Sequence, residues 1–114
     1  MLSETPSLSQ EVTRLHAELC SALADPNRIL LIYALAESAT NVNDLAAKLG
    51  LSQPATSRHL KILRERGLVH AIRRGPSVEY SLTDERLIEA LNLLRAVLRD
   101  NIAYRASLVD TERP

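Results

Sequence analysis

A glycine at position 50 constrains the fold more than any other residue in the chain. Apolar residues recur at helical spacing over residues 43–49, and a left-handed glycine is a common stop for a helix. Just beyond it, Ser52 can accept hydrogen bonds from the backbone amides of a new helix, and Pro54 falls in that helix's first turn, where a missing N–H is tolerated. Two helices joined by a tight glycine turn are typical of a helix-turn-helix, predicted here over residues 42–66.

The second of these helices has two unlike faces. Leu60 and Leu63 face inward, with Thr56 on the same side. The opposite, free face carries small or polar side chains, namely Gln53, Ser57, Arg58 and Lys61. A helix that enters the major groove of DNA needs a small leading end and side chains that donate and accept at base edges. This face therefore predicts a DNA-recognition helix.

After Gly67 the apolar period changes to that of strands. Two short runs rich in Val, Ile and Tyr flank the sequence RRGPS, which supplies the glycine and proline of a turn. We expect a β-hairpin over residues 68–82, with Arg73 and Arg74 at its tip. A hairpin that follows a recognition helix is a wing.

Two helices are predicted before this unit. An amphipathic helix begins at Ser9, which can serve as its N-cap, and runs to about residue 23. Asp25 and Pro26 then open a second helix that is apolar nearly all round and ends near Glu37, before a polar loop. A helix without a polar face is expected to be the buried one.

A long last helix is predicted over residues 84–106, with Thr83 as its cap and acids in its first turn, as the helix dipole favours. Leucines recur along it at steps of four, three and four, at Leu87, Leu91, Leu94 and Leu98. One small domain does not cover such a seam fully, so we expect a homodimer through the first and last helices.

The composition fits a small, mostly helical fold with one hairpin. The 114 residues correspond to one domain, predicted over residues 9–108 after a flexible terminus at residues 1–8. Hydrophobic residues make up 46%, but Phe and Trp are absent, so the core must be aliphatic. No apolar run approaches the roughly 18 residues that span a bilayer, and the first residues do not have the pattern of a signal peptide. We expect a cytoplasmic protein without a membrane partner.

The formal net charge of zero hides an uneven distribution. Residues 52–80 contain six basic and two acidic side chains, a charge of +4, and the remainder of the chain carries −4. A basic middle can bind a polyanion such as DNA, although basic residues on helices are more often a solvated face. Charge alone therefore does not identify DNA as the ligand, and the spacing of the residues has to decide.

The order of these elements, and three blocks of sequence, resemble the ArsR/SmtB family of small bacterial transcriptional repressors. The blocks are LADPNRILLIYAL at 23–35, DLAAKLGLSQPATSRHLKILRERGLV at 44–69 and RRGPSVEYSLTD at 73–84. The resemblance covers nearly the whole chain and implies a homodimeric winged helix-turn-helix protein. It further implies repression at a palindromic operator in double-stranded DNA, and release when an effector binds.

Side-chain chemistry assigns the DNA contacts. Gln53 suits an adenine edge and Arg58 a guanine edge or a phosphate, whereas Ser57 and Thr56 can reach either. Thr56 has an alternative role as a partly buried support, and His59 is placed at the DNA and not at a metal. The remaining cations, Lys61, Arg73 and Arg74, are assigned to phosphates or to the minor groove, which give affinity without sequence information.

The sensor sites known in the family are not reproduced. One metal site uses Cys-x-Cys at the start of the helix before the turn, where this chain has Asn41 and Asn43, and neither suits a soft metal. A second uses Asp-x-His and two further ligands in the last helix, at positions that here read Asp84, Arg86, Val97 and Asp100. Sulfur-sensing members pair a second-helix cysteine, here Tyr33, with a cysteine in the last helix, which has none.

One pair of ligand-type side chains remains in the first helix. His16 and Cys20 lie four residues apart and share a face, so that a two-fold axis can bring two pairs together as Cys₂His₂. Two alternatives to a metal site remain for Cys20, which can be a buried structural residue or a redox-active thiol. His16 is then a polar surface residue. We expect no cofactor, with a metal at this pair as the lesser alternative.

Enzymatic motifs are not found. The sequence has no glycine-rich phosphate loop and no G-x-S-x-G elbow, so we expect no enzyme. Two functions of different classes remain. The first is a sequence-specific repressor that an unidentified effector releases from its operator. The alternative is a winged-helix dimer without an inducer that organises DNA or acts through a partner protein.

Overall fold

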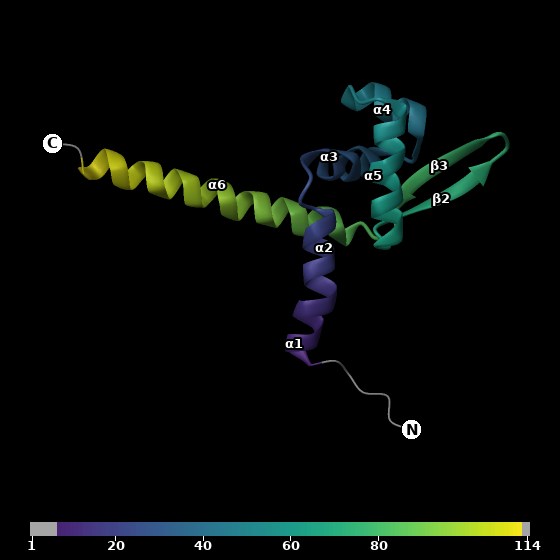
Figure 1. Ribbon diagram of the computed structural model, residues 1–114. Helices are drawn as coiled ribbons and strands as arrows, with labels where there is room; N and C mark the ends of the chain where they lie inside the picture. Colours follow the sequence, from purple (N-terminus) through teal and green to yellow (C-terminus); the bar gives the residue numbers. More distant parts are fainter. Residues whose placement is uncertain (1–6, 113–114) are drawn as a thin grey trace. The chain divides into compact units, whose positions relative to one another are not determined.

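The computed structural model describes residues 7–112, with side chains to residue 109. It divides into two compact units, Met1–Thr83 and Asp84–Pro114, which are taken here in turn. The first contains α1 (Leu8–Glu11), the π-helical segment η1 (Val12–His16), α2 (Ala17–Ala22), α3 (Pro26–Glu37), β1 (Thr40–Asn41), α4 (Val42–Leu49), α5 (Gln53–Glu65), β2 (Val69–Arg74) and β3 (Ser77–Leu82) (Figure 1). The second contains α6 (Arg86–Glu112).

The core of the first unit forms around α3. Asp25 caps this helix by accepting a hydrogen bond from the backbone N–H of Asn27 at 2.8 Å, and Pro26 is its first residue. The side chains of Leu31 and Ile32 are fully buried, as expected for a helix that is apolar nearly all round. The other core residues are Ala22, Ala34, Leu35, Leu45, Ala46, Thr56, Leu60, Leu63 and Val69. The prediction that this helix is the buried one is confirmed.

The helix-turn-helix forms where the sequence predicts it, as α4 and α5. Gly50 adopts a φ of 68°, and its N–H and the N–H of Leu51 bond to carbonyls in the last turn of α4. Ser52 caps α5, with its hydroxyl accepting from the N–H of Ala55 at 3.2 Å. At the other end, the side chain of Asn41 caps α4 by accepting from the N–H of Asp44 at 2.8 Å. Each helix end thus has a partner supplied by its own flanking residues.

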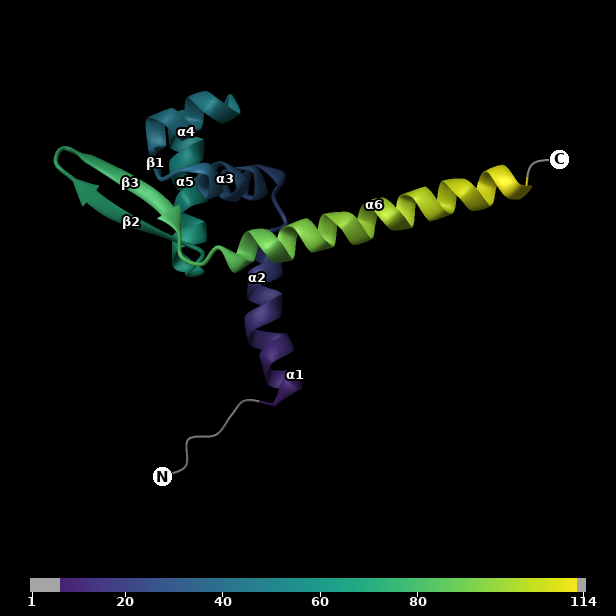
Figure 2. The ribbon, with the colours of Figure 1, turned by 180° about the vertical axis from the view of Figure 1, so that it is seen from behind.

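Strands β2 and β3 form the expected hairpin. They pair antiparallel from Val69 opposite Leu82 to Arg74 opposite Ser77, and the two residues between them include Gly75 at a φ of 61°. A third strand was not predicted. β1 pairs with β3, with Thr40 opposite Tyr80, in a segment expected to be a polar loop. Figure 2 shows β1 beside β3, at the start of α4. Two residues are too few for a strand period to be visible in the sequence.

The first helix differs from its prediction at its start and in its regularity. Its cap is Ser7 and not Ser9: the Ser7 hydroxyl accepts from the N–H of Gln10 at 3.2 Å, and the Gln10 side chain accepts from the N–H of Ser7 at 3.0 Å. A π-helical segment at Val12–His16 interrupts it. Of the flexible terminus predicted over residues 1–8, residues 1–6 lie outside the described residues, and Leu8 is helical.

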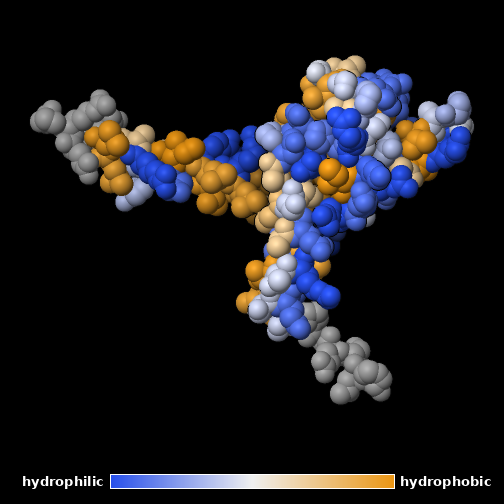
Figure 3. All heavy atoms as spheres, in the orientation of Figure 1, coloured by the Kyte–Doolittle hydropathy of each residue, from blue (hydrophilic) through white to orange (hydrophobic). Residues whose placement is uncertain are grey.

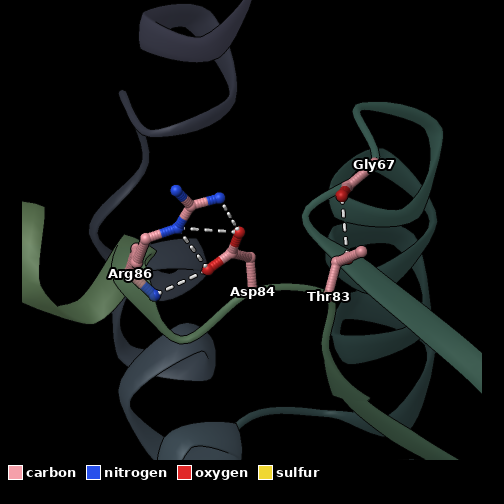
Figure 4. Close-up of polar contacts among 4 residues, drawn as sticks. All are labelled: Gly67, Thr83, Asp84 and Arg86. Atoms are coloured by element: carbon pink, nitrogen blue, oxygen red, sulfur yellow. Dashed lines mark hydrogen bonds and ion pairs between the residues drawn. The ribbon is translucent and has the colours of Figure 1, made fainter.

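The start of the last helix also differs from its prediction. The hydroxyl of Thr83 donates to the carbonyl of Gly67 at 2.7 Å and so closes the base of the hairpin, which leaves it no role as a helix cap (Figure 4). Asp84 takes that role by accepting from the N–H of Arg86 at 2.9 Å, and the Arg86 guanidinium also donates to it. These bonds lower the pKa of Asp84 to about 2. The helix runs from Arg86 to Glu112 and so extends beyond the predicted residue 106.

None of the described helices is by itself long and apolar enough to cross a membrane. The consecutive segments Leu8–Ala22 and Pro26–Glu37, bent by 87°, meet the length and composition requirement only as a pair.

The turn geometry predicts the effect of a substitution at Gly50. An added Cβ would meet no described heavy atom within 4 Å, so the cost of Gly50→Ala comes from the left-handed backbone alone. We expect a loss of about 1 kcal/mol in the free energy of unfolding, measured by urea denaturation. Gly50→Asn is the matched control, because asparagine tolerates this conformation better. Equal losses for both variants would contradict the backbone explanation.

Candidate nucleic-acid interface

The free face of α5 carries most of the predicted base-contacting residues. Gln53, Arg58 and Lys61 are exposed, and Ser57 is half-buried. The amide of Gln53 donates to the Ser57 hydroxyl at 3.2 Å, so these two side chains form a small polar patch at the leading end of the helix. The structure therefore brings four of the predicted residues onto one helix face, and their side chains include both donors and acceptors, as base edges do.

Thr56 lies on the other side of α5. Its side chain is fully buried, and its hydroxyl donates to the carbonyl of Ser52 at 2.9 Å. A buried hydroxyl bonded to its own helix cannot reach a base without unfolding the first turn. Its placement among the DNA-contacting residues is therefore corrected, and the alternative role as a support fits the geometry. The reason is that Thr56 shares the inward stripe with Leu60 and Leu63.

His59 faces the protein as well as the solvent. It is half-buried, and its Nδ1 lies 3.4 Å from Nη1 of Arg28, at the start of α3. One ring nitrogen is thus directed at a neighbouring helix, which the prediction of a DNA contact did not foresee. Arg28 was missed altogether, because a contact between residues 31 positions apart leaves no periodic signal in the sequence.

The cations of the hairpin lie at the end of β2. Arg73 and Arg74 are both exposed, and Nε of Arg74 forms an ion pair with Oε1 of Glu79 on β3 at 3.0 Å. Figure 3 shows hydrophilic residues at the far end of this hairpin. Exposed ion pairs are weak, so a phosphate can replace the Glu79 carboxylate as the partner of Arg74.

A groove of about 450 Å³ lies beside the recognition face. Its walls come from α4, α5 and β3, through residues that include Asn43, Asp44, Gln53, Ser57, Ser77 and Tyr80. Asp44 is the one charged residue among those that line it. Because Gln53 and Ser57 belong to both surfaces, a molecule in this groove would touch two of the side chains predicted to contact DNA.

His16 and Cys20 are both exposed, and Cys20 is a free thiol. The first lies in η1 and the second in α2. Within residues 7–112, no three His, Cys, Asp or Glu side chains are grouped so that they could hold a metal ion. Cys20 is not covered by its own chain, and the pairing of two such sites across a two-fold axis stays a prediction.

The residues at the family's metal positions have structural roles in this chain. Asn41 caps α4 through its side-chain oxygen, and its amide nitrogen donates to the Asp44 carboxylate at 3.1 Å. Asp84 is held by the backbone and side chain of Arg86. Both positions thus serve helix ends, and their side chains are already engaged.

Known proteins resemble this chain in sequence. Residues 25–71 match the family described as "Bacterial regulatory protein, arsR family". A "Transcriptional repressor SmtB homolog" of Synechocystis is 47% identical over 81 residues, which are 71% of this chain and 59% of that protein. The "HTH-type transcriptional regulator CmtR" of Mycobacterium tuberculosis is 40% identical over 99 residues, 86% of this chain and 76% of that protein. The chain thus spans less than two thirds of the length of the SmtB homolog and more than two thirds of the length of CmtR.

Solved structures agree with the sequence relatives. NolR from Sinorhizobium fredii superimposes with a TM-score of 0.71 at 31% identity, covering 84% of this chain and 96% of that one. Rv0081 of M. tuberculosis superimposes with a TM-score of 0.76 at 32% identity, covering 83% and 96%. With the helix-turn-helix, the hairpin and the sequence relatives in agreement, the chain belongs to the arsR family of bacterial regulatory proteins and has their winged helix-turn-helix fold.

Proposed function

We propose that this protein is a sequence-specific transcriptional repressor that binds a palindromic operator as a homodimer and is released by an effector. One observation carries the proposal: α5 is fixed by a fully buried stripe on one side and exposes a compact polar face on the other. A helix held in this way can read base edges at small entropic cost, because its backbone is already ordered.

The chemistry of the exposed groups divides the DNA contacts into two kinds. On α5, Gln53, Ser57 and Arg58 can read the edges of bases in the major groove. The cations Lys61, Arg73 and Arg74 supply phosphate or minor-groove contacts, which position the protein without reading sequence. The hairpin and α5 are joined through Gly67 and Leu68 and pack against each other, so both kinds of contact come from one compact unit.

Homodimer formation is supported by apolar side chains left exposed on the helices at both ends of the chain. On α6 these are Leu93, Leu94, Val97, Leu98, Ile102, Tyr104, Leu108 and Val109, and near the N-terminus Leu8, Val12 and Leu15. Figure 3 shows the apolar residues along α6. Such a surface is larger than soluble monomers usually expose. A winged helix-turn-helix domain from Mycobacterium bovis, 22% identical with a TM-score of 0.75, is described as homodimeric.

A two-fold dimer presents two copies of α5 with opposite polarity. The operator it fits is therefore an inverted repeat, with half-sites about one helical turn apart or a multiple of that distance. DNA as the ligand also implies that the protein works in the cytoplasm. The effector is unidentified, and the groove shared by Gln53 and Ser57 offers one place where a ligand would compete with DNA.

Fluorescence anisotropy with DNA from upstream of the protein's own gene tests the proposal. We expect a preference for operator over random DNA of about 10³ or more at physiological salt. Arg58→Ala should reduce this preference by about 5- to 150-fold, the value of one good bidentate base contact. Arg74→Ala should weaken binding to both DNAs equally and lower the salt dependence by about one phosphate contact.

The two arginine variants serve as controls for each other, since both remove one positive charge from an exposed side chain. Equal losses on operator and random DNA for Arg58→Ala would show that Arg58 does not read a base. A wild-type protein with no preference between the two DNAs would instead indicate the function of a DNA organiser without an operator.

The dimer surface on α6 is tested by placing a charge within it. Leu98 is 59% exposed in the single chain, and Leu98→Glu should convert the dimer to a monomer in sedimentation at micromolar concentration. Operator affinity should then fall by more than 100-fold, because one half-site is contacted at a time. Ala103→Glu adds the same charge at an exposed position on the opposite side of this helix and should leave the dimer intact. A dimer that survives the leucine substitution places the interface elsewhere.

The ion pair between Arg74 and Glu79 on the hairpin allows a test of the proposed phosphate contact of Arg74. Glu79→Gln frees Arg74 for phosphate, so binding to any DNA should tighten by up to about 5-fold, as the small value of an exposed pair allows. Glu65→Gln makes the same change in net charge at the end of α5. If both variants tighten binding equally, the effect comes from total charge and not from the pair with Arg74.

A further inference from the structure

Arg28 contacts two helices besides its own, and the proposed function gives it no role. Its Nε donates to the carbonyl of Ala22 at 2.5 Å, and its Nη2 donates to the carbonyl of Ser21 at 3.2 Å. Its Nη1 lies 3.4 Å from Nδ1 of His59 on the recognition helix. One half-buried guanidinium thus links the last turn of α2, the first turn of α3 and the middle of α5.

The position of Arg28 is unfavourable for its own helix. It is the third residue of α3, where the helix dipole disfavours a positive charge. The guanidinium is directed instead to the carbonyls of Ser21 and Ala22 at the C-terminus of α2, where the dipole of that helix favours a cation. The arginine therefore stabilises the junction between α2 and α3 and not the start of α3.

The remaining nitrogen connects this junction with DNA recognition. His59 follows Arg58 directly, and it is one turn before Leu63 on the helix that carries the reading face. Since Arg can only donate, a hydrogen bond between these two atoms uses Nδ1 of His59 as the acceptor. If the last turn of α2 moves, Arg28 must either leave its carbonyls or carry the histidine with it.

We propose that Arg28 is a positioning residue that couples the last turn of α2 to the recognition helix through His59, so that displacement of the N-terminal helices changes how α5 meets DNA. This inference rests on the proposed function. It identifies a route by which an event at the N-terminal helices reaches the DNA, whatever its chemical nature. It needs two arrangements of one contact and no change in the core of the domain.

A second contact between α2 and the end of α5 offers a matched control. Nη1 of Arg66, at the end of α5, lies 3.8 Å from Oε2 of Glu18 on α2, and the two side chains are 40% and 61% exposed. This pair joins the same elements but is accessible to water, so it should couple them weakly. Arg28→Lys and Arg66→Lys keep every charge and remove only the planar arrangement of donors.

Cys20 supplies a reporter, because it is the one cysteine of the chain, is exposed and directly precedes Ser21. An environment-sensitive fluorophore on Cys20 should respond when saturating operator DNA binds the wild-type protein, because coupling between two sites is reciprocal. In Arg28→Lys this response should disappear, and the preference for operator over random DNA should fall about 10-fold, within the range for coupling through side chains. In Arg66→Lys both should be retained.

His59→Gln separates coupling from a lost DNA contact. A histidine that only touches DNA would leave the fluorophore response intact once the operator is saturating, whereas a coupling histidine abolishes it. The double variant Arg28→Lys/His59→Gln should lose no more preference than the single variants, since both remove the same link. If Arg28→Lys does not fold, as judged by circular dichroism, the fluorophore response of His59→Gln decides alone.

The outcomes distinguish this inference from the function on which it rests. A labelled wild-type protein without operator preference overturns the proposed function, and the inference with it. A wild-type protein with operator preference, whose Arg28→Lys variant keeps both the preference and the fluorophore response, overturns the inference alone. A variant that only melts at a lower temperature, with preference and response unchanged, shows that Arg28 serves stability and also overturns the inference.

Discussion

The burial of one face of α5 is the constraint on which the rest of the structure depends. Leu60, Leu63 and Thr56 are fully buried, and the helix packs against α3, α4 and β2. Close packing on that face leaves a single orientation for the helix, and therefore a single orientation for the polar residues opposite. The aliphatic composition of the chain serves this arrangement, since a recognition surface can be no more precise than the core that supports it.

The parts of the fold that could be predicted from the sequence are those set by neighbouring residues. Gly50, the caps at Asp25 and Ser52, and the inward stripe of α5 follow from spacing and local hydrogen bonds, and the structure confirms them. Contacts between distant residues were not predicted. The pairing of β1 with β3, the bond from Thr83 to Gly67 and the contact of Arg28 with His59 each depend on the tertiary fold. Thr56 was assigned to DNA because its hydroxyl can bond to a base, although its position puts it on the same side of α5 as Leu60 and Leu63.

The family resemblance is strongest where DNA is read and weakest where an effector would be sensed. Residues 25–71 carry the family match and include the whole helix-turn-helix. Asn41 and Asp84, at the positions of known metal ligands, instead complete the ends of α4 and α6. A side chain that caps a helix is costly to redirect toward a metal, because the orphaned backbone amide would lose its partner. We therefore propose that the effector of this protein contacts residues other than Asn41 and Asp84.

The two-residue strand β1 connects the hairpin of β2 and β3 to the start of α4. Asn41 pairs with Glu79 on β3 and also caps α4, so a single residue joins the base of the hairpin to the helix-turn-helix. The hairpin is thus anchored to α4 at the level of Glu79, and the residues between Ile72 and Val78 extend beyond this anchor. Insertions or deletions around Gly75 and Pro76 would change which phosphates the tip reaches but not the angle of approach.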